Sequence, residues 1–202
     1  IIGSESYKAD VEIINLAYET LKKIGVKNIV IEITAPFFLD SLLKKITNKD
    51  LKNKLKKYIK LKDINNCLKL LKKNELYNSF KTLHLCSGSI QNKKKYISKL
   101  NKIIGYENEV ERLVKIANLI KTSKNDSLSV DFFDLQKNKN YYKGIKFTFF
   151  AKDVRGEIAG GGRYNLKYGS NSETAIGYTC YMDTILRSSS LVIQTKKILI
   201  AF

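Results

Sequence analysis

The chain has 202 residues, enough for one domain with a substantial core, and its 37 basic and 19 acidic residues give a net charge of +18. The three cysteines are widely spaced without a Cys-x-x-Cys pair, which argues against a disulfide framework or a zinc site. No apolar run reaches the roughly 20 residues that a bilayer-spanning helix needs. We expect a cytoplasmic protein without metal or cofactor.

The positive charge alone does not indicate nucleic-acid binding. Only four basic residues are arginines, and lysines occur in every segment. Base recognition favours Arg, and binding faces favour clustered charge. We therefore attribute the lysines to compositional bias, and tRNA is not expected as a partner.

The first half of the chain predicts one helix, one strand and then further helices. Ser6 suits the N-cap of a helix that ends at Gly25, and isoleucines alternate through a strand over residues 28–34. Pro36, the only proline, suits a helix start. Amphipathic patterns then continue to about residue 120, so we expect a helical insert over about residues 36–122, packed on a sheet.

The single histidine, His84, lies between two leucines and predicts a partly buried, structural side chain. With one histidine and no cluster around it, a Ser/His/Asp or Cys/His nucleophile system is not expected. We predict that Cys67, Cys86 and Cys180 are small buried hydrophobic residues.

The second half predicts an antiparallel sheet flanked by helices, an α+β layout. The expected strands are residues 127–133, 141–150, 155–159 and 174–178, followed by a helix over 181–187. A short linker then precedes the start of another strand at 197–202.

Three consecutive glycines, Gly160, Gly161 and Gly162, precede Arg163. A backbone without side chains lets another molecule or strand approach closely. The planar guanidinium suits a carboxylate or phosphate. Taken alone, such a triplet indicates only a hairpin or bulge.

The triplet, however, stands between two other motifs. The order Tyr-Tyr-x-Gly at residues 141–144, Ala-Gly-Gly-Gly-Arg-Tyr at 159–164 and Ile-Gly-Tyr at 176–178 resembles the histidyl-tRNA synthetase family. There these elements are the histidine-specific signature strands and the third class II motif. Residues 2–5, Ile-Gly-Ser-Glu, resemble the segment after the second motif. The resemblance, specific over residues 1–25 and 135–187, implies a class II aminoacyl-tRNA synthetase-like core.

Three positions depart from the synthetase pattern. The family has an Arg before the Tyr-Tyr pair where this chain has Lys137. Its third motif has a second Gly where this chain has Tyr181, and an ATP-binding Arg where this chain has Thr184. A hydroxyl cannot replace a guanidinium that neutralises phosphate charge. Aminoacyl-adenylate chemistry is therefore not expected.

One branch of the family has lost this chemistry, the regulatory subunit of ATP phosphoribosyltransferase. Residues 182–185, Met-Asp-Thr-Ile, look like its third motif. The resemblance implies a non-catalytic subunit for the first step of histidine biosynthesis. It also implies a short catalytic phosphoribosyltransferase partner, a homodimer of this chain and a response to histidine.

The same resemblance implies a vestigial histidine-type pocket, floored by Gly160–Gly162 and walled by Tyr141 and Tyr142. Arg163 either faces a ligand carboxylate or holds the sheet together. Lys137 and Tyr142 either contact the amino acid or are a solvated lysine and a core aromatic residue.

Two other functions stay open: a divergent histidyl-tRNA synthetase that activates histidine with ATP, and a paralogue that binds tRNA. The chain starts in mid-motif, so we expect residues 1–192 to be a core incomplete at its N-terminus. Residues 193–202 are expected to start a C-terminal segment.

Overall fold

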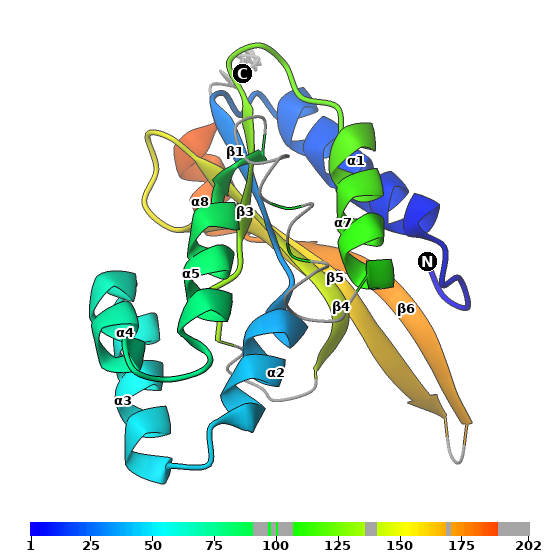
Figure 1. The fold of residues 1–202 in the computed structure, drawn as a ribbon. Helices are drawn as coiled ribbons and strands as arrows, with labels where there is room; N and C mark the ends of the chain where they lie inside the picture. Colours follow the sequence, from blue (N-terminus) through cyan, green and yellow to red (C-terminus); the bar gives the residue numbers. More distant parts are fainter. Residues whose placement is uncertain (91–96, 98–99, 101–106, 136–140, 169–170, 190–202) are drawn as a thin grey trace, which may run out of the picture.

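The structure is a computed structural model that describes residues 1–90, 97, 100, 107–135, 141–168 and 171–189 (Figure 1). A six-stranded sheet in the order β2-β3-β1-β4-β5-β6 forms its centre. The strands are β1 (Ile29–Thr34), β2 (Gly88–Ser89), β3 (Ser127–Asp131), β4 (Tyr142–Ala151), β5 (Glu157–Tyr168) and β6 (Asn171–Cys180). The predicted α+β class is confirmed.

The sheet is mixed, so the prediction of a wholly antiparallel sheet is wrong at one pair. β1 and β3 run parallel, with Val30 opposite Ser127, whereas β1–β4, β4–β5 and β5–β6 are antiparallel. Parallel neighbours need a long crossover connection, and the helical segment between β1 and β3 supplies it. Within the predicted helical insert, residues 88–89 form the short strand β2, which pairs with β3 at the sheet edge.

Seven helices surround the sheet in the described residues. They are α1 (Tyr7–Lys23), α2 (Pro36–Lys45), α3 (Lys49–Lys60), α4 (Ile64–Leu71), α5 (Tyr77–Cys86), α7 (Glu107–Leu119) and α8 (Met182–Ser188). The predicted start of α1 is confirmed, because the Ser6 hydroxyl accepts a hydrogen bond from the Lys8 N–H at 3.2 Å. Gly25 follows this helix with φ +89°, a conformation that favours glycine. None of these helices is long and apolar enough to cross a membrane.

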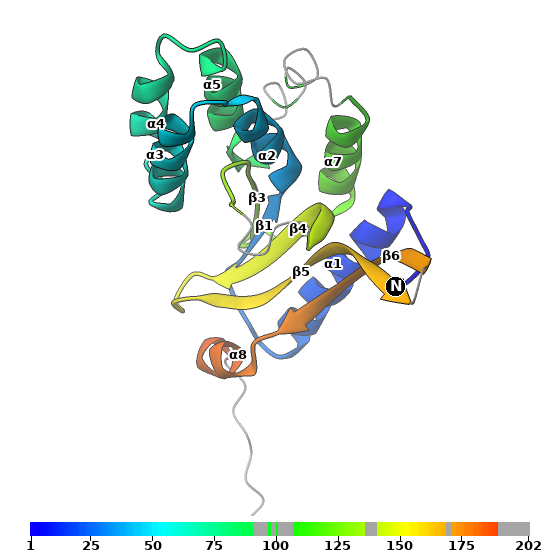
Figure 2. The same cartoon turned by 90° about the horizontal axis from the view of Figure 1, so that it is seen from below.

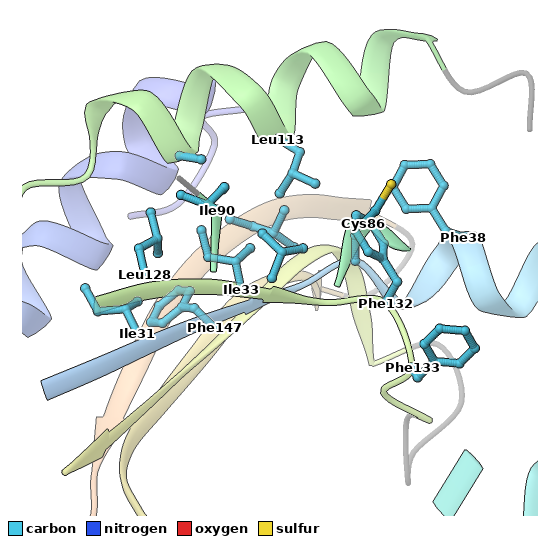
Figure 3. Close-up of a cluster of buried hydrophobic side chains, with 14 of the residues drawn as sticks. Ile31, Ile33, Phe38, Cys86, Ile90, Leu113, Leu128, Phe132, Phe133 and Phe147 are labelled. Carbon is cyan, nitrogen blue, oxygen red and sulfur yellow. The ribbon is translucent and has the colours of Figure 1, made fainter. Parts of the chain in front are cut away.

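One face of the sheet carries the hydrophobic core, beneath α1 and α7 (Figures 1 and 2). Figure 3 shows Ile31 and Ile33 of β1 and Phe147 of β4 packed below Leu113 of α7. We call this the helix-covered face. Strand alternation puts Glu32, Thr148, Gly160 and Thr179 in one row on the opposite face.

Two predictions about single side chains are wrong. His84 is exposed, because the buried stripe of α5 runs through Phe80, Leu83 and Cys86 and leaves His84 beside it. Its ring still lies edge-on to Phe133, with centroids 6.4 Å apart. Cys67 and Cys86 are buried as predicted, but Cys180, at the end of β6, is only half-buried.

Candidate functional site

The glycine triplet lies inside β5, where neighbouring strands pair with it on both sides. Gly161 stands between Phe147 of β4 and Tyr178 of β6. None of the three glycines has a positive φ, so lack of space for a side chain, rather than backbone conformation, explains Gly161 and Gly162, whereas Gly160 has room for a Cβ atom. A Cβ atom on Gly161 would collide with the Gly177 carbonyl oxygen.

Tyrosines stand over these glycines on the face opposite the helix-covered face. The Tyr142 ring lies where a Cβ of Gly162 would point, 2.6 Å from that position. The Tyr141 ring stacks on Tyr164, with centroids 5.6 Å apart and planes 5° from parallel. Tyr141 also meets Tyr142 edge-to-face, with centroids 4.8 Å apart. Such pairs prefer these geometries and hold each other in place.

Together these residues enclose a pocket of about 160 Å³. We call it the tyrosine–glycine pocket, and it is lined by Tyr141, Tyr142, Gly160, Gly161, Gly162, Tyr164, Gly177, Tyr178 and Thr179. Among the residues that the structure describes, the lining offers ring faces, hydroxyls and main-chain groups but no charged side chain. The volume of the pocket is below the roughly 300–1,000 Å³ typical of sites for drug-sized ligands. The pocket therefore has room for a ligand of amino-acid size, held by stacking and hydrogen bonds, and its described lining residues supply no acid–base pair.

Burial and nearby charged groups affect the Tyr142 phenol. Burial raises the pKa of its phenol, and the neighbouring Tyr141 adds to this, while Lys146 opposes it. Lys146 forms an ion pair with Asp134 at 2.9 Å. Burial alone would lower the pKa of Lys146, but this bond and the charges of Asp134 and Glu157 raise it. Tyr142 thus stays a neutral hydrogen-bonding group at neutral pH.

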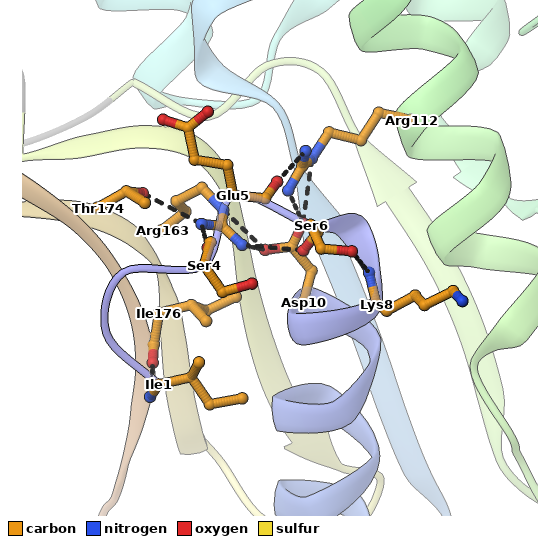
Figure 4. A network of polar contacts seen from close by, with 10 residues as sticks. All are labelled: Ile1, Ser4, Glu5, Ser6, Lys8, Asp10, Arg112, Arg163, Thr174 and Ile176. Carbon is orange, nitrogen blue, oxygen red and sulfur yellow. Dashed lines mark hydrogen bonds and ion pairs between the residues drawn. The ribbon is translucent and has the colours of Figure 1, made fainter.

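Arg163 lies apart from the pocket, on the helix-covered face (Figure 4). Its Nη1 donates to the Ser4 carbonyl oxygen at 2.6 Å and to Thr174 Oγ1 at 3.1 Å. Its Nη2 donates to the Ser6 carbonyl oxygen at 3.3 Å, and the remaining bonds go to Asp10. These contacts join β5 to β6, to α1 and to the segment before α1. Of the two roles open for Arg163, they fit holding the sheet together.

Asp10 also accepts hydrogen bonds from a second arginine. Arg112 of α7 donates to Asp10 Oδ2 from Nε at 3.1 Å and from Nη2, and its Nη1 donates to the Glu5 carbonyl oxygen at 2.7 Å. Asp10 is fully buried, so its negative charge holds three elements at one point. We call Asp10, Arg112 and Arg163 the Asp10 network.

The third-motif residues form the end of β6 and the start of α8. The Tyr181 hydroxyl lies 3.5 Å from the position that a Cβ of Gly160 would take, so its side chain reaches over the glycines. Thr184 is buried at 6% exposure, and its hydroxyl oxygen accepts a bond from Arg187 Nη2 at 3.4 Å. Arg187 itself is mostly exposed and pairs with Asp183 at 3.6 Å.

The structure thus brings together five of the seven predicted site residues: Tyr141, Tyr142, Gly160, Gly161 and Gly162. Arg163 lies on the other face, and Lys137 is outside the described residues. Sequence reasoning left Tyr164, Gly177, Tyr178 and Thr179 out of the predicted site. Period-two alternation indicates Tyr164, which follows Gly162 on the same side of β5, whereas the β6 residues depend on register.

Comparison with known proteins places this arrangement in a family. A family model described as histidyl-tRNA synthetase matches residues 1–185. Curated relatives are named ATP phosphoribosyltransferase regulatory subunit. The relative from Rhodospirillum centenum is 24% identical over 93% of this chain and 48% of its own length. The relative from Clostridium botulinum is 28% identical over 100% of this chain and 51% of its own length. The chain spans about half the length of these relatives.

Solved structures share the fold. An ATP phosphoribosyltransferase regulatory subunit/histidyl-tRNA synthetase from Bacillus halodurans superposes with a TM-score of 0.74 at 18% identity, covering 93% of this chain and 51% of that one. The histidyl-tRNA synthetase from Nostoc gives a TM-score of 0.68 at 15% identity, covering 92% of this chain and 47% of that one. A chain of the Thermotoga maritima ATP phosphoribosyl transferase complex gives a TM-score of 0.65 at 17% identity, covering 89% of this chain and 62% of that one.

The matched residues run from the first residue into α8 and include β4, β5 and β6, the strands that build the tyrosine–glycine pocket. The match to the family model covers most of the sequence. The chain belongs to the histidyl-tRNA synthetase family.

Proposed function

We propose that this chain is a non-catalytic regulatory subunit of an ATP phosphoribosyltransferase, needed for the first step of histidine biosynthesis. The names of the curated relatives support this function. The fold shared with a chain of the Thermotoga maritima complex supports a hetero-oligomer with a catalytic subunit. A homodimer and a response to histidine remain predictions.

The observation that carries the proposal is the state of the third motif. Where the family's arginine would meet ATP, Thr184 is buried and its hydroxyl is occupied by Arg187. Where the family has a glycine, the Tyr181 side chain reaches over Gly160. An uncharged, buried hydroxyl does not neutralise phosphate. These two substitutions argue against nucleotide activation by this site.

The described lining of the tyrosine–glycine pocket supports a role in binding an amino acid through rings and hydroxyls. Tyr141 and Tyr164 offer stacked ring faces, and Tyr142 offers a neutral hydroxyl above Gly162. A planar side chain such as imidazole stacks on such rings. We propose that the pocket binds histidine without activating it, and a contact from Lys137, which lies outside the described residues, stays a prediction.

The test uses the complete protein with its catalytic partner. We expect the phosphoribosyltransferase to need this subunit for full turnover, and its inhibition by histidine to weaken when Tyr142 is replaced by Ala. We expect no histidine-dependent exchange of pyrophosphate into ATP. Partner turnover and histidine inhibition that do not depend on this chain would overturn the proposal.

The rival function is a divergent histidyl-tRNA synthetase, favoured by the family model and by the Nostoc structure. It predicts robust pyrophosphate exchange and histidine transfer to tRNA by the complete protein. The same exchange assay separates the two functions, because only the synthetase forms an aminoacyl adenylate.

A further inference from the structure

The two ends of the tyrosine–glycine pocket have different surroundings. At one end, the Tyr142 ring lies 2.6 Å from the position that a Cβ of Gly162 would take. At the other end, the Tyr181 hydroxyl at 3.5 Å and Glu157 Oε2 at 3.8 Å approach the same position on Gly160. Both glycines line the pocket, and strand alternation puts their Cβ positions on the same face of β5. An aromatic ring therefore stands over one end, and a carboxylate with a hydroxyl stands over the other.

An irregularity in the strand pairing explains why Glu157 reaches this end of the pocket. Phe149 of β4 pairs with Ala159, but the next residue, Phe150, pairs with Glu157, so β5 has one extra residue here. Strict alternation along β5 would send Glu157 and Gly160 to opposite faces. The extra residue redirects the side chain, and its carboxylate comes to the Gly160 side. Glu157 is thus a neighbour of the pocket rather than one of its lining residues.

The Glu157 carboxylate acts on the pocket and keeps its negative charge. Burial raises the pKa of the Tyr142 phenol, and the charge of Glu157 contributes to this rise, so the carboxylate lies within electrostatic range of the ring. Glu157 is exposed and forms no ion pair with a residue that the structure describes. The nearby cation Lys146 is bonded to Asp134 at 2.9 Å, and Arg187 of α8 is paired within its own helix. One uncompensated negative charge thus stands beside an otherwise neutral lining.

We propose that Glu157 is a specificity residue of the tyrosine–glycine pocket, and that its carboxylate accepts hydrogen bonds from the ammonium group of the ligand. This inference rests on the proposed binding of histidine in the pocket. The ring of the ligand lies against Tyr142 at the other end, two residues or ~7 Å further along the strand, which is the scale of an amino acid of this size. An ammonium–carboxylate hydrogen bond is roughly twice as strong as a neutral one.

The test titrates the complete protein with histidine, histamine and imidazole-4-propionate, followed by calorimetry. Histamine has the ammonium but not the carboxylate of histidine, and imidazole-4-propionate has the carboxylate but not the ammonium. At about pH 8 the imidazole ring is neutral, so the ammonium is the cation that each ligand has or lacks. We expect histamine to bind about tenfold more tightly than imidazole-4-propionate, because Glu157 attracts the first and repels the second. The reverse order of affinities would overturn the proposal.

Two variants with the same change of charge locate the carboxylate that recognises the ligand. Glu157→Gln removes the charge and keeps the shape of the side chain. We expect it to weaken the binding of histidine and histamine about fivefold, the size of effect that an exposed ion pair has, and not to weaken the binding of imidazole-4-propionate. Glu12→Gln removes a negative charge from an exposed position on α1, on the helix-covered face. This control should bind all three ligands as the parent protein does.

The outcomes separate the role of Glu157 from the histidine binding on which it rests. If the parent protein binds histidine and Glu157→Gln binds histidine and histamine equally well, the role of Glu157 is refuted and histidine binding stands. An equal loss for all three ligands would also refute that role, because a loss that does not depend on the ammonium means a general disturbance of the pocket. A parent protein that binds none of the three ligands would refute histidine binding and the role of Glu157 together.

Discussion

Arg163 donates two hydrogen bonds to one oxygen of Asp10, from Nε at 2.9 Å and from Nη2 at 2.6 Å. Both residues are buried, with 6% and 0% exposure. The pair joins the first helix to the glycine strand, 153 residues further along the chain. The motif arginine is thus tied to a carboxylate inside the protein.

Loss of the Asp10 carboxylate should destabilise the fold strongly. In Asp10→Asn, the guanidinium groups of Arg112 and Arg163 lose their shared negative partner. Removing one member of a buried ion pair typically costs about 3–5 kcal/mol. Urea unfolding monitored by circular dichroism measures the change, with Asp183→Asn, in an exposed pair with Arg187, as the control. Equal unfolding midpoints for the two variants would contradict a structural role for the network.

Alanine at each glycine of the triplet should have a different effect. A Cβ on Gly160 meets only ordinary contacts, of which the Tyr181 hydroxyl at 3.5 Å is the nearest. A Cβ on Gly161 collides with the backbone of β6, and overpacking of this kind costs about 1–3 kcal/mol or more. We expect Gly160→Ala to fold normally and Gly161→Ala to fold poorly.

Gly162→Ala should act on the pocket itself. The added methyl group meets the Tyr142 ring at 2.6 Å and the Ile145 carbonyl oxygen at 2.7 Å. Both the ring and the β4 backbone have to shift, which changes the wall of the tyrosine–glycine pocket and also lowers the stability of the variant. Histidine titration of the Gly160→Ala and Gly162→Ala proteins compares the two. If both bound histidine equally well, the predicted pocket would not be the histidine site.

Stability should depend on pH through Glu32. Burial raises the pKa of its carboxyl, the negative charge of Asp131 adds to this, and Lys62 and Lys146 oppose it. The folded pKa lies above the unfolded value of about 4.3. The stabilising effect of the protonated form is therefore complete below that value and is lost as pH rises through the folded pKa.

Glu32→Gln removes this pH dependence. We expect the variant to be more stable than the parent protein at pH 7 and to differ little from it at pH 4. Thermal unfolding at the two pH values measures the difference. The opposite sign, with greater destabilisation at pH 7, would show that the bonds of the ionised carboxylate outweigh its burial.

Restoring the family's arginine by Thr184→Arg should destabilise the protein without restoring ATP binding. The site is buried, and the nearest acid along the helix, Asp183, is exposed and already paired with Arg187. Burying an unpaired charge typically costs more than about 1 kcal/mol. Thr184→Val is the control for the lost hydroxyl. A stable Thr184→Arg protein that binds ATP would support the synthetase function instead.

The sequence predicts the fold better than it predicts the site. Local signals such as Ser6, Gly25 and Pro36 locate helix ends, because capping depends on neighbouring residues. The parallel pairing of β1 with β3 was missed, because no short-range pattern specifies which distant strands meet. Residue order alone does not say that Arg163 is bonded to Asp10.

For the candidate site, too, local motifs were predicted from the sequence and long-range pairings were not. Tyr141, Tyr142 and the glycines form recognisable motifs, and the structure brings them together. Tyr178 and Thr179 line the pocket only because β6 pairs with β5 in one register. The position of His84 was wrong because helical phase, rather than neighbouring leucines, decides which side chains are buried.

The parallel pair β1–β3 has a consequence for how the chain folds. Ile29 N–H donates to Asp126 Oδ1, and Ser129 Oγ to the Ile31 carbonyl oxygen, contacts that span 97 and 98 residues of sequence. Closing so long a loop costs conformational entropy before the contacts between the two strands can stabilise the sheet. Such a high contact order slows folding. We expect the intervening helices to gain structure first, so that the central strands are joined late.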